Sequence, residues 1–185
     1  MDGKQRSDVE RNHEAILLAA IGVLSESPRA AMADIAVASG VGRSTLYRHF
    51  PDRAALIQAI LRRVISEVVE AVSGHLQNAG DRDPVAVLVD IAEAIMQIGE
   101  GYRFLEYNAS KDRSQAPPRG EVLASFISDC QRDGTVRGDV PAGWLFTIFA
   151  AVCMTASRYD FADGQERAVT LARTVRCLFE PRPVG

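Results

Sequence analysis

The residues best suited to chemistry are concentrated in one short stretch, SGVGRSTLYRHFPDR at residues 39–53. A turn with two glycines is followed there by a run of side chains that donate hydrogen bonds. These donors are Arg43, Ser44, Thr45, Tyr47, Arg48, His49 and Arg53. Asp52 is the one carboxylate beside them, whereas the whole chain has a formal net charge of −3. A basic spot on a chain that is not basic overall favours an anionic partner bound at one place.

The sequence contains few of the residue patterns that are typical of enzymes. The histidines lack a Cys, Asp or Glu partner at metal-site spacing, and they are His13, His49 and His75. No G-x-S-x-G motif, phosphate-binding loop or dinucleotide fingerprint is found. Glu93, Glu100 and Glu106 are expected to be solvated helix charges rather than an acid–base pair. The sequence therefore predicts no enzymatic activity, metal or cofactor, and a helical enzyme is the disfavoured alternative.

Composition bounds the class of protein further. The 185 residues are 47% hydrophobic and 24% charged, which is ordinary for a soluble globular chain. The polar residues 1–15 do not resemble a secretory signal, and the apolar stretch 142–156 is shorter than the roughly 20 residues of a membrane span. Cys130, Cys153 and Cys177 lie in apolar patterns, so we expect buried, reduced thiols. These features predict a cytoplasmic protein without a membrane partner.

Helical periodicity runs through nearly the whole chain and predicts an all-α fold of about nine helices. The predicted helices cover residues 8–26, 32–39, 43–50, 53–72, 84–98, 101–110, 120–132, 141–158 and 164–179. Residues 111–120 are expected to form an exposed loop and residues 181–185 a frayed tail. The pattern divides into a compact unit of three short helices at 1–52 and a larger helical body at 53–185.

Residues 32–50 have the layout of a helix-turn-helix motif, whose second helix enters the major groove of DNA. Ala36 is small enough for the helices to approach closely, and Gly40 can adopt a positive φ in the turn. Apolar positions would lock the pair to the first helix, and they are Ile35, Val41, Leu46 and Phe50. Asp52 is placed to cap the helix that follows.

Residues 34–56, DIAVASGVGRSTLYRHFPDRAAL, closely resemble the N-terminal signature of TetR-type transcriptional repressors. The matching positions are Ile35-Ala36, Gly40-Val41, Leu46-Tyr47, His49-Phe50, Arg53 and Leu56. The resemblance implies a sequence-specific regulator that binds a palindromic operator in double-stranded DNA as a homodimer and is released by a small-molecule inducer. A helix-turn-helix protein that shapes DNA without sequence specificity is the alternative, and the net charge of −3 argues against it.

The resemblance also implies roles for the donors. Arg43, Ser44 and Thr45 would face base edges or phosphates, whereas Tyr47 and His49 would donate to phosphates. Arg48 belongs to the same set, with solvent as its alternative environment. Arg53 stands where the family usually has lysine and would hold a phosphate at the start of the next helix.

Relatives commonly have hydroxyl side chains at three positions where this chain has none. Ala30 and Ala31 precede the second helix, and Gly42 begins the third. Loss of a capping oxygen costs about 0.5–2 kcal/mol of helix stability. We therefore expect DNA binding to depend more on Arg43, Tyr47 and Arg53.

The C-terminal body is expected to provide the dimer interface and an inducer pocket. The helix at 141–158 is apolar on two faces, so one face would meet a partner; a single thick monomeric core is the alternative. The predicted dimer residues are Leu145, Ile148, Phe149, Val152, Leu171, Val175 and Leu178. The predicted pocket residues, for a mostly apolar or aromatic inducer, are Met96, Tyr102, Phe104, Tyr107, Phe126 and Trp144. Their alternative role is ordinary core packing.

Overall fold

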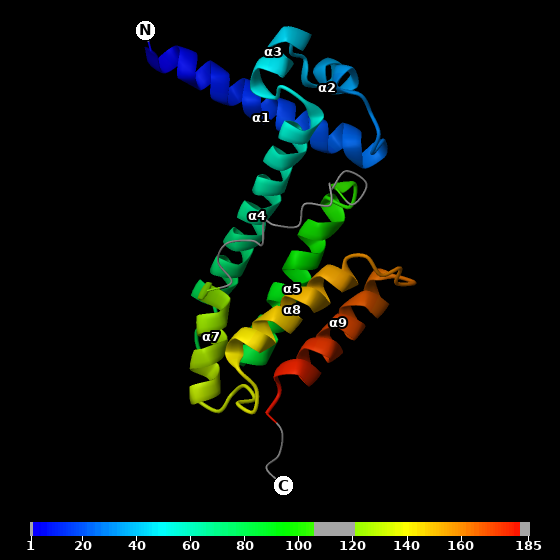
Figure 1. Ribbon diagram of the computed structural model, residues 1–185. Helices are drawn as coiled ribbons and strands as arrows, with labels where there is room; N and C mark the ends of the chain where they lie inside the picture. The colour runs from blue at the N-terminus through cyan, green and yellow to red at the C-terminus, as the bar shows by residue number, and fades with distance from the viewer. Residues whose placement is uncertain (1, 106–120, 182–185) are drawn as a thin grey trace. The chain divides into compact units, whose positions relative to one another are not determined.

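The computed structural model describes residues 2–105 and 121–181 (Figure 1), and these ranges contain helices and no strand. The helices are α1 (Asp2–Glu26), α2 (Met32–Ser39), α3 (Arg43–His49), α4 (Arg53–Gln77), α5 (Pro84–Gly101), α7 (Glu121–Arg132), α8 (Ala142–Ala156) and α9 (Gly164–Phe179). The all-α prediction is confirmed. Of the helix predicted at 101–110, residues 102–104 form a turn and the part from 106 on lies outside the described residues, as does the loop predicted at 111–120.

The chain divides into two compact units. One contains Met1–Val64 and Gly101–Ser114, and the other contains Ile65–Glu100 and Gln115–Gly185. The first division falls inside α4, so this helix contributes its beginning to one unit and its end to the other.

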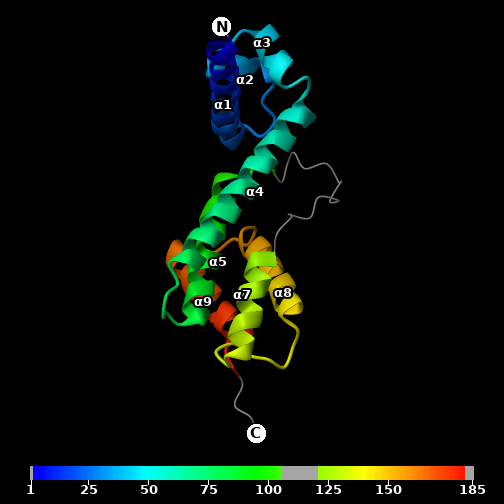
Figure 2. The ribbon, with the colours of Figure 1, turned by 90° about the vertical axis from the view of Figure 1, so that its left-hand side faces the viewer.

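In the first unit, α1, α2 and α3 lie together around the start of α4 (Figures 1 and 2). Periodic apolar side chains of these helices form one core, which also includes Phe104 and Leu105. Gly40 has a φ of 70°, a left-handed conformation that favours glycine, and its N–H donates to the Val37 carbonyl. The predicted turn and the tight approach at Ala36, which is 3% exposed, are confirmed.

In the second unit, one core is built from α5, α7, α8 and α9. The helix α5 is apolar on most of its surface and buries seven of its residues. α7 packs on α8, and α8 on α9 (Figure 2). Phe149 of α8 meets Phe179 of α9 edge to face, with ring centroids 5.7 Å apart.

The thiol predictions hold for two of the three cysteines. Cys130 and Cys153 are buried, and burial raises the pKa of Cys153 to about 12. The prediction of a buried thiol is wrong for Cys177, because this residue lies on the exposed side of α9. Within residues 2–105 and 121–181, no helix combines the length and the apolar character needed to cross a bilayer.

Candidate nucleic-acid interface

The helix α3 is held to the first unit by two apolar side chains. Leu46 is 0% exposed and Phe50, just after the helix, is 2% exposed. Gly42 precedes the helix in an extended conformation, and its carbonyl accepts the N–H groups of Thr45 and Leu46 at 2.9 and 3.0 Å. Glycine thus tolerates the capping geometry, although it supplies no side-chain oxygen. The predicted core role of Leu46 and Phe50 is confirmed.

This anchoring leaves one face of α3 in solvent. Arg43, Ser44, Tyr47 and Arg48 are exposed, with Tyr47 48% exposed. Because residues three and four apart are neighbours on a helix, these four side chains share a surface. Thr45 flanks this surface and is half-buried. The face contains two guanidinium groups and two hydroxyl groups, which suits hydrogen bonding to phosphates and base edges.

His49 lies on the inner flank of α3. Its ring centroid is 5.9 Å from that of His13 in α1, and its Nε2 atom is shielded from solvent without a hydrogen-bond partner among the described residues. Desolvation by burial, then the His13 ring and the Arg48 guanidinium, lower the pKa of His49 from its ordinary value of 6.5. The lowered pKa favours the neutral ring, in which one nitrogen donates and the other accepts.

Arg53, the first residue of α4, is half-buried and bonded to the turn between α1 and α2. Its Nη1 donates to the Ala30 carbonyl at 2.5 Å and its Nη2 to the Pro28 carbonyl at 2.7 Å. A cation at a helix N-terminus is unfavourable by about 0.3–1 kcal/mol. Hydrogen bonds to charged groups contribute about 1.5–3 kcal/mol each and offset this cost. Nothing in the sequence signals these partners, which lie 23 and 25 residues away.

Aspartates accept backbone N–H groups at the starts of α2 and α4. Ala31 supplies no side-chain cap to α2, as expected, but Asp34 Oδ2 accepts the Ala31 N–H at 2.8 Å. In a capping box, the side chain at the third helical position accepts the N–H of the residue before the helix, and Asp34 does this for Ala31. An acidic residue at the third position of α2 is the sequence signal that could have predicted this bond. The predicted cap on α4 is confirmed, because Asp52 Oδ1 accepts the Ala55 N–H at 2.7 Å.

The structure separates the residues predicted for the dimer interface. Leu145, Phe149, Leu171 and Val175 lie in the core of their own unit, each at most 2% exposed. Ile148, Val152 and Leu178 are half-buried. The face of α8 with Trp144, Ile148 and Val152 is only partly covered by the core of its own unit, because Trp144 is 57% exposed.

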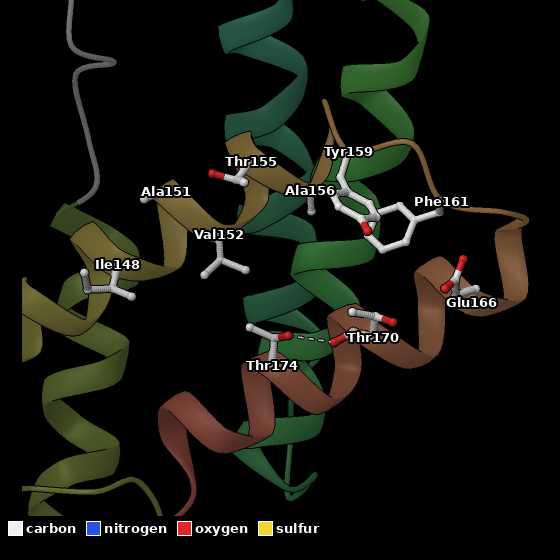
Figure 3. Close-up of a pocket in the computed structure, with 10 residues that line it drawn as sticks. All are labelled: Ile148, Ala151, Val152, Thr155, Ala156, Tyr159, Phe161, Glu166, Thr170 and Thr174. Carbon is white, nitrogen blue, oxygen red and sulfur yellow. Dashed lines mark hydrogen bonds between the residues drawn. The ribbon is translucent and has the colours of Figure 1, made fainter.

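Ile148 and Val152 line an open groove of about 410 Å³ between α8 and α9 (Figure 3). Figure 3 shows Tyr159 and Phe161 close together at one end of the groove, where their ring centroids are 4.7 Å apart. The remaining lining residues are Ala151, Thr155, Ala156, Glu166, Thr170 and Thr174. Apolar and small polar side chains thus dominate the groove.

The described residues predicted for an inducer pocket lie in different surroundings. Met96 is a core residue of the second unit, and Phe104 belongs to the core of the first, with Tyr102 packed against it. Phe126 lines a hollow beside Leu76, whereas Trp144 is exposed. Tyr107, like Glu106, lies outside the described residues.

The first unit has the architecture of a helix-turn-helix DNA-binding protein, with α3 as the recognition helix. Comparison with known proteins agrees, because the family model described as bacterial regulatory proteins, tetR family, matches residues 16–60. The chain is 34% identical over 165 residues to the transcriptional repressor LfrR of Mycolicibacterium smegmatis, covering 85% of this chain and 83% of LfrR. It is 32% identical over 179 residues to the transcriptional regulator EthR of Mycobacterium tuberculosis, covering 89% and 82%. The chain belongs to the TetR family of DNA-binding transcriptional regulators.

A solved structure supports the same assignment across both units. LfrR in complex with proflavine aligns with a TM-score of 0.63 at 27% identity, covering 90% of this chain and 94% of LfrR. The resemblance seen in the sequence is confirmed, and the protein is a transcriptional regulator rather than an enzyme.

Proposed function

We propose that this protein is a cytoplasmic repressor that binds a palindromic operator as a homodimer. A small, mostly apolar or aromatic molecule bound by the C-terminal body would release it. The proposal assigns DNA binding to residues 1–52 and dimerisation and ligand binding to residues 53–185. The observation that carries it is the exposed donor face of α3, fixed to its unit by Leu46 and Phe50.

The donors divide into two groups in this proposal. Arg43, Ser44 and Thr45 begin α3, and the N-terminal residues of a recognition helix are those that reach base edges. The second group would bind phosphates and fix the register on the duplex, and it contains Tyr47, Arg48 and His49. The local excess of guanidinium groups over carboxylates supports this assignment.

The groove between α8 and α9 supports the homodimer. Tyr159 lines this groove and is 63% exposed, and on α8 outside the groove Trp144 and Met154 are 57% and 56% exposed. Exposed side chains of this kind mark interaction surfaces. A second copy would cover Ile148 and Val152 with the same helices and complete a four-helix bundle. A two-fold dimer would then place recognition helices about 34–36 Å apart, one turn of DNA.

The inducer class is supported by the apolar character of the second unit and by its relatives. LfrR is named a repressor, and its solved structure contains the aromatic compound proflavine. An inducer changes DNA affinity only by favouring one arrangement of the two recognition helices over another. The helix α4 is the expected transmitter, since it contributes residues to both units.

Selection of bound sequences from random double-stranded DNA tests the function. We expect enrichment of an inverted repeat with half-site centres about one helical turn apart. Enrichment of no inverted repeat would contradict sequence-specific dimer binding. Equal affinity for the selected duplex and a scrambled duplex, at the same salt concentration, would instead favour the non-specific architectural alternative.

A further inference from the structure

Arg53 joins segments that are far apart in the sequence. Its two terminal nitrogens donate to two carbonyl groups, those of Pro28 and Ala30, in the turn between α1 and α2. The side chain is half-buried, whereas Asp52 and Ala54 on either side are exposed. The planar guanidinium group presents two donors at a fixed separation, a geometry that a lysine ammonium does not reproduce. We call this pair of hydrogen bonds the Arg53 fork.

The fork acts on the turn that leads into α2, where the Ala30 N–H also donates to the Ser27 carbonyl and the Ala31 N–H to Asp34. α2 has eight residues and α3 has seven, and helices of this length do not hold a position without tertiary contacts. The position before α2 is Ala31, which supplies no side-chain cap. The fork adds a connection from the first residue of α4 to this turn, which sets the direction of α2.

We propose that Arg53 is a positioning residue for DNA recognition. By bonding the turn before α2, it fixes α2 and α3 on the start of α4, so that the donors of α3 meet the operator in register. This proposal rests on the proposed DNA-binding function. It differs from a phosphate contact by Arg53, because a positioning role requires the fork geometry and a phosphate contact requires only the positive charge.

The two roles are separated by comparing Arg53→Lys with Arg53→Ala. The probe is the palindromic duplex that the wild-type chain selects from random DNA, titrated between 50 and about 300 mM salt. We expect both variants to lose about tenfold or more in affinity for this duplex. Their affinity for a scrambled duplex and the slope of log affinity against log salt should equal those of the wild type.

Two results would contradict the positioning role of Arg53. Wild-type affinity of Arg53→Lys would show that charge alone is needed. A slope shallower by about 0.9 for each lost contact would identify a phosphate ligand. Arg62→Ala is the matched control, because Arg62 is an exposed arginine on the same helix, and we expect it to bind as the wild type does.

A second readout needs no DNA. In the folded protein, both Arg53 variants should shift the backbone amide NMR signals of residues 27–32, and Arg62→Ala should not. Unshifted signals of residues 27–32 would contradict the positioning role of Arg53. Failure of both variants to fold would also contradict it, because a positioning role requires that the first unit folds without the Arg53 fork. If the wild-type chain selects no palindrome, the proposed function fails while these signals still report on the fork.

Discussion

Tyr47→Phe tests the recognition face with the smallest change available. Tyr47 is 48% exposed on α3, and its hydroxyl group is the group that we expect to bind phosphate. The substitution removes one oxygen and leaves the ring packing and the fold in place. The thermal unfolding midpoint should therefore equal that of the wild type.

The expected loss in DNA affinity follows from one hydrogen bond per subunit. A bond to a charged phosphate contributes about 1.5–3 kcal/mol, and each 1.4 kcal/mol is a factor of ten. One lost bond gives at least about a tenfold loss, and the two half-sites of a dimer together give about a hundredfold loss. Tyr47→Ala should lose at least as much.

A gel-shift or anisotropy titration at fixed salt, on the selected palindrome, measures this loss. The scrambled duplex serves as the reference for binding without sequence recognition. An affinity within threefold of the wild type would refute the phosphate contact and leave Tyr47 as a surface aromatic residue.

The other substitutions test packing, assembly and pH dependence. Leu46→Ala should lower the free energy of unfolding of the first unit by about 2–5 kcal/mol, measured by urea denaturation, because Leu46 is 0% exposed; an unchanged midpoint would contradict its anchoring role. Ile148→Glu should place a charge in the α8–α9 groove and give monomers in light scattering, with loss of operator binding, whereas a dimer that persists would exclude this groove as the interface. Because the pKa of His49 is lowered in the folded state, stability should be full above about pH 6.5 and fall as the pH drops towards the folded pKa. His49→Gln should reduce this dependence in urea denaturation at pH 8 and pH 5, and an identical pH dependence in wild type and variant would refute the assignment.

The helix-turn-helix was predictable because its signals are local. Gly40 has the positive φ that its place in the turn suggested. Asp52 caps α4 by accepting the N–H of Ala55, only three residues along the chain. Leu46 and Phe50 fall on the apolar period and are buried. In such cases the residue and its partner lie within one or two helical turns, so spacing alone carries the information.

Contacts between distant segments were not predictable in this way. The partners of Arg53 lie in another turn, and the pairing of His13 with His49 joins α1 to α3. α8 is apolar on both faces, so periodicity did not decide that Leu145 faces the core and Trp144 faces solvent. Phe104 looked like a pocket residue from its type, whereas its burial in the first core is a property of the tertiary fold.

In the proposed complex, two copies of α3 read one palindrome from the same side of the duplex. Hydroxyl-radical footprinting of the full chain on the selected duplex measures this most directly. We expect two protected stretches related by the two-fold axis of the palindrome, with centres about 34–36 Å apart. A single protected stretch, or even protection along the whole duplex, would contradict it.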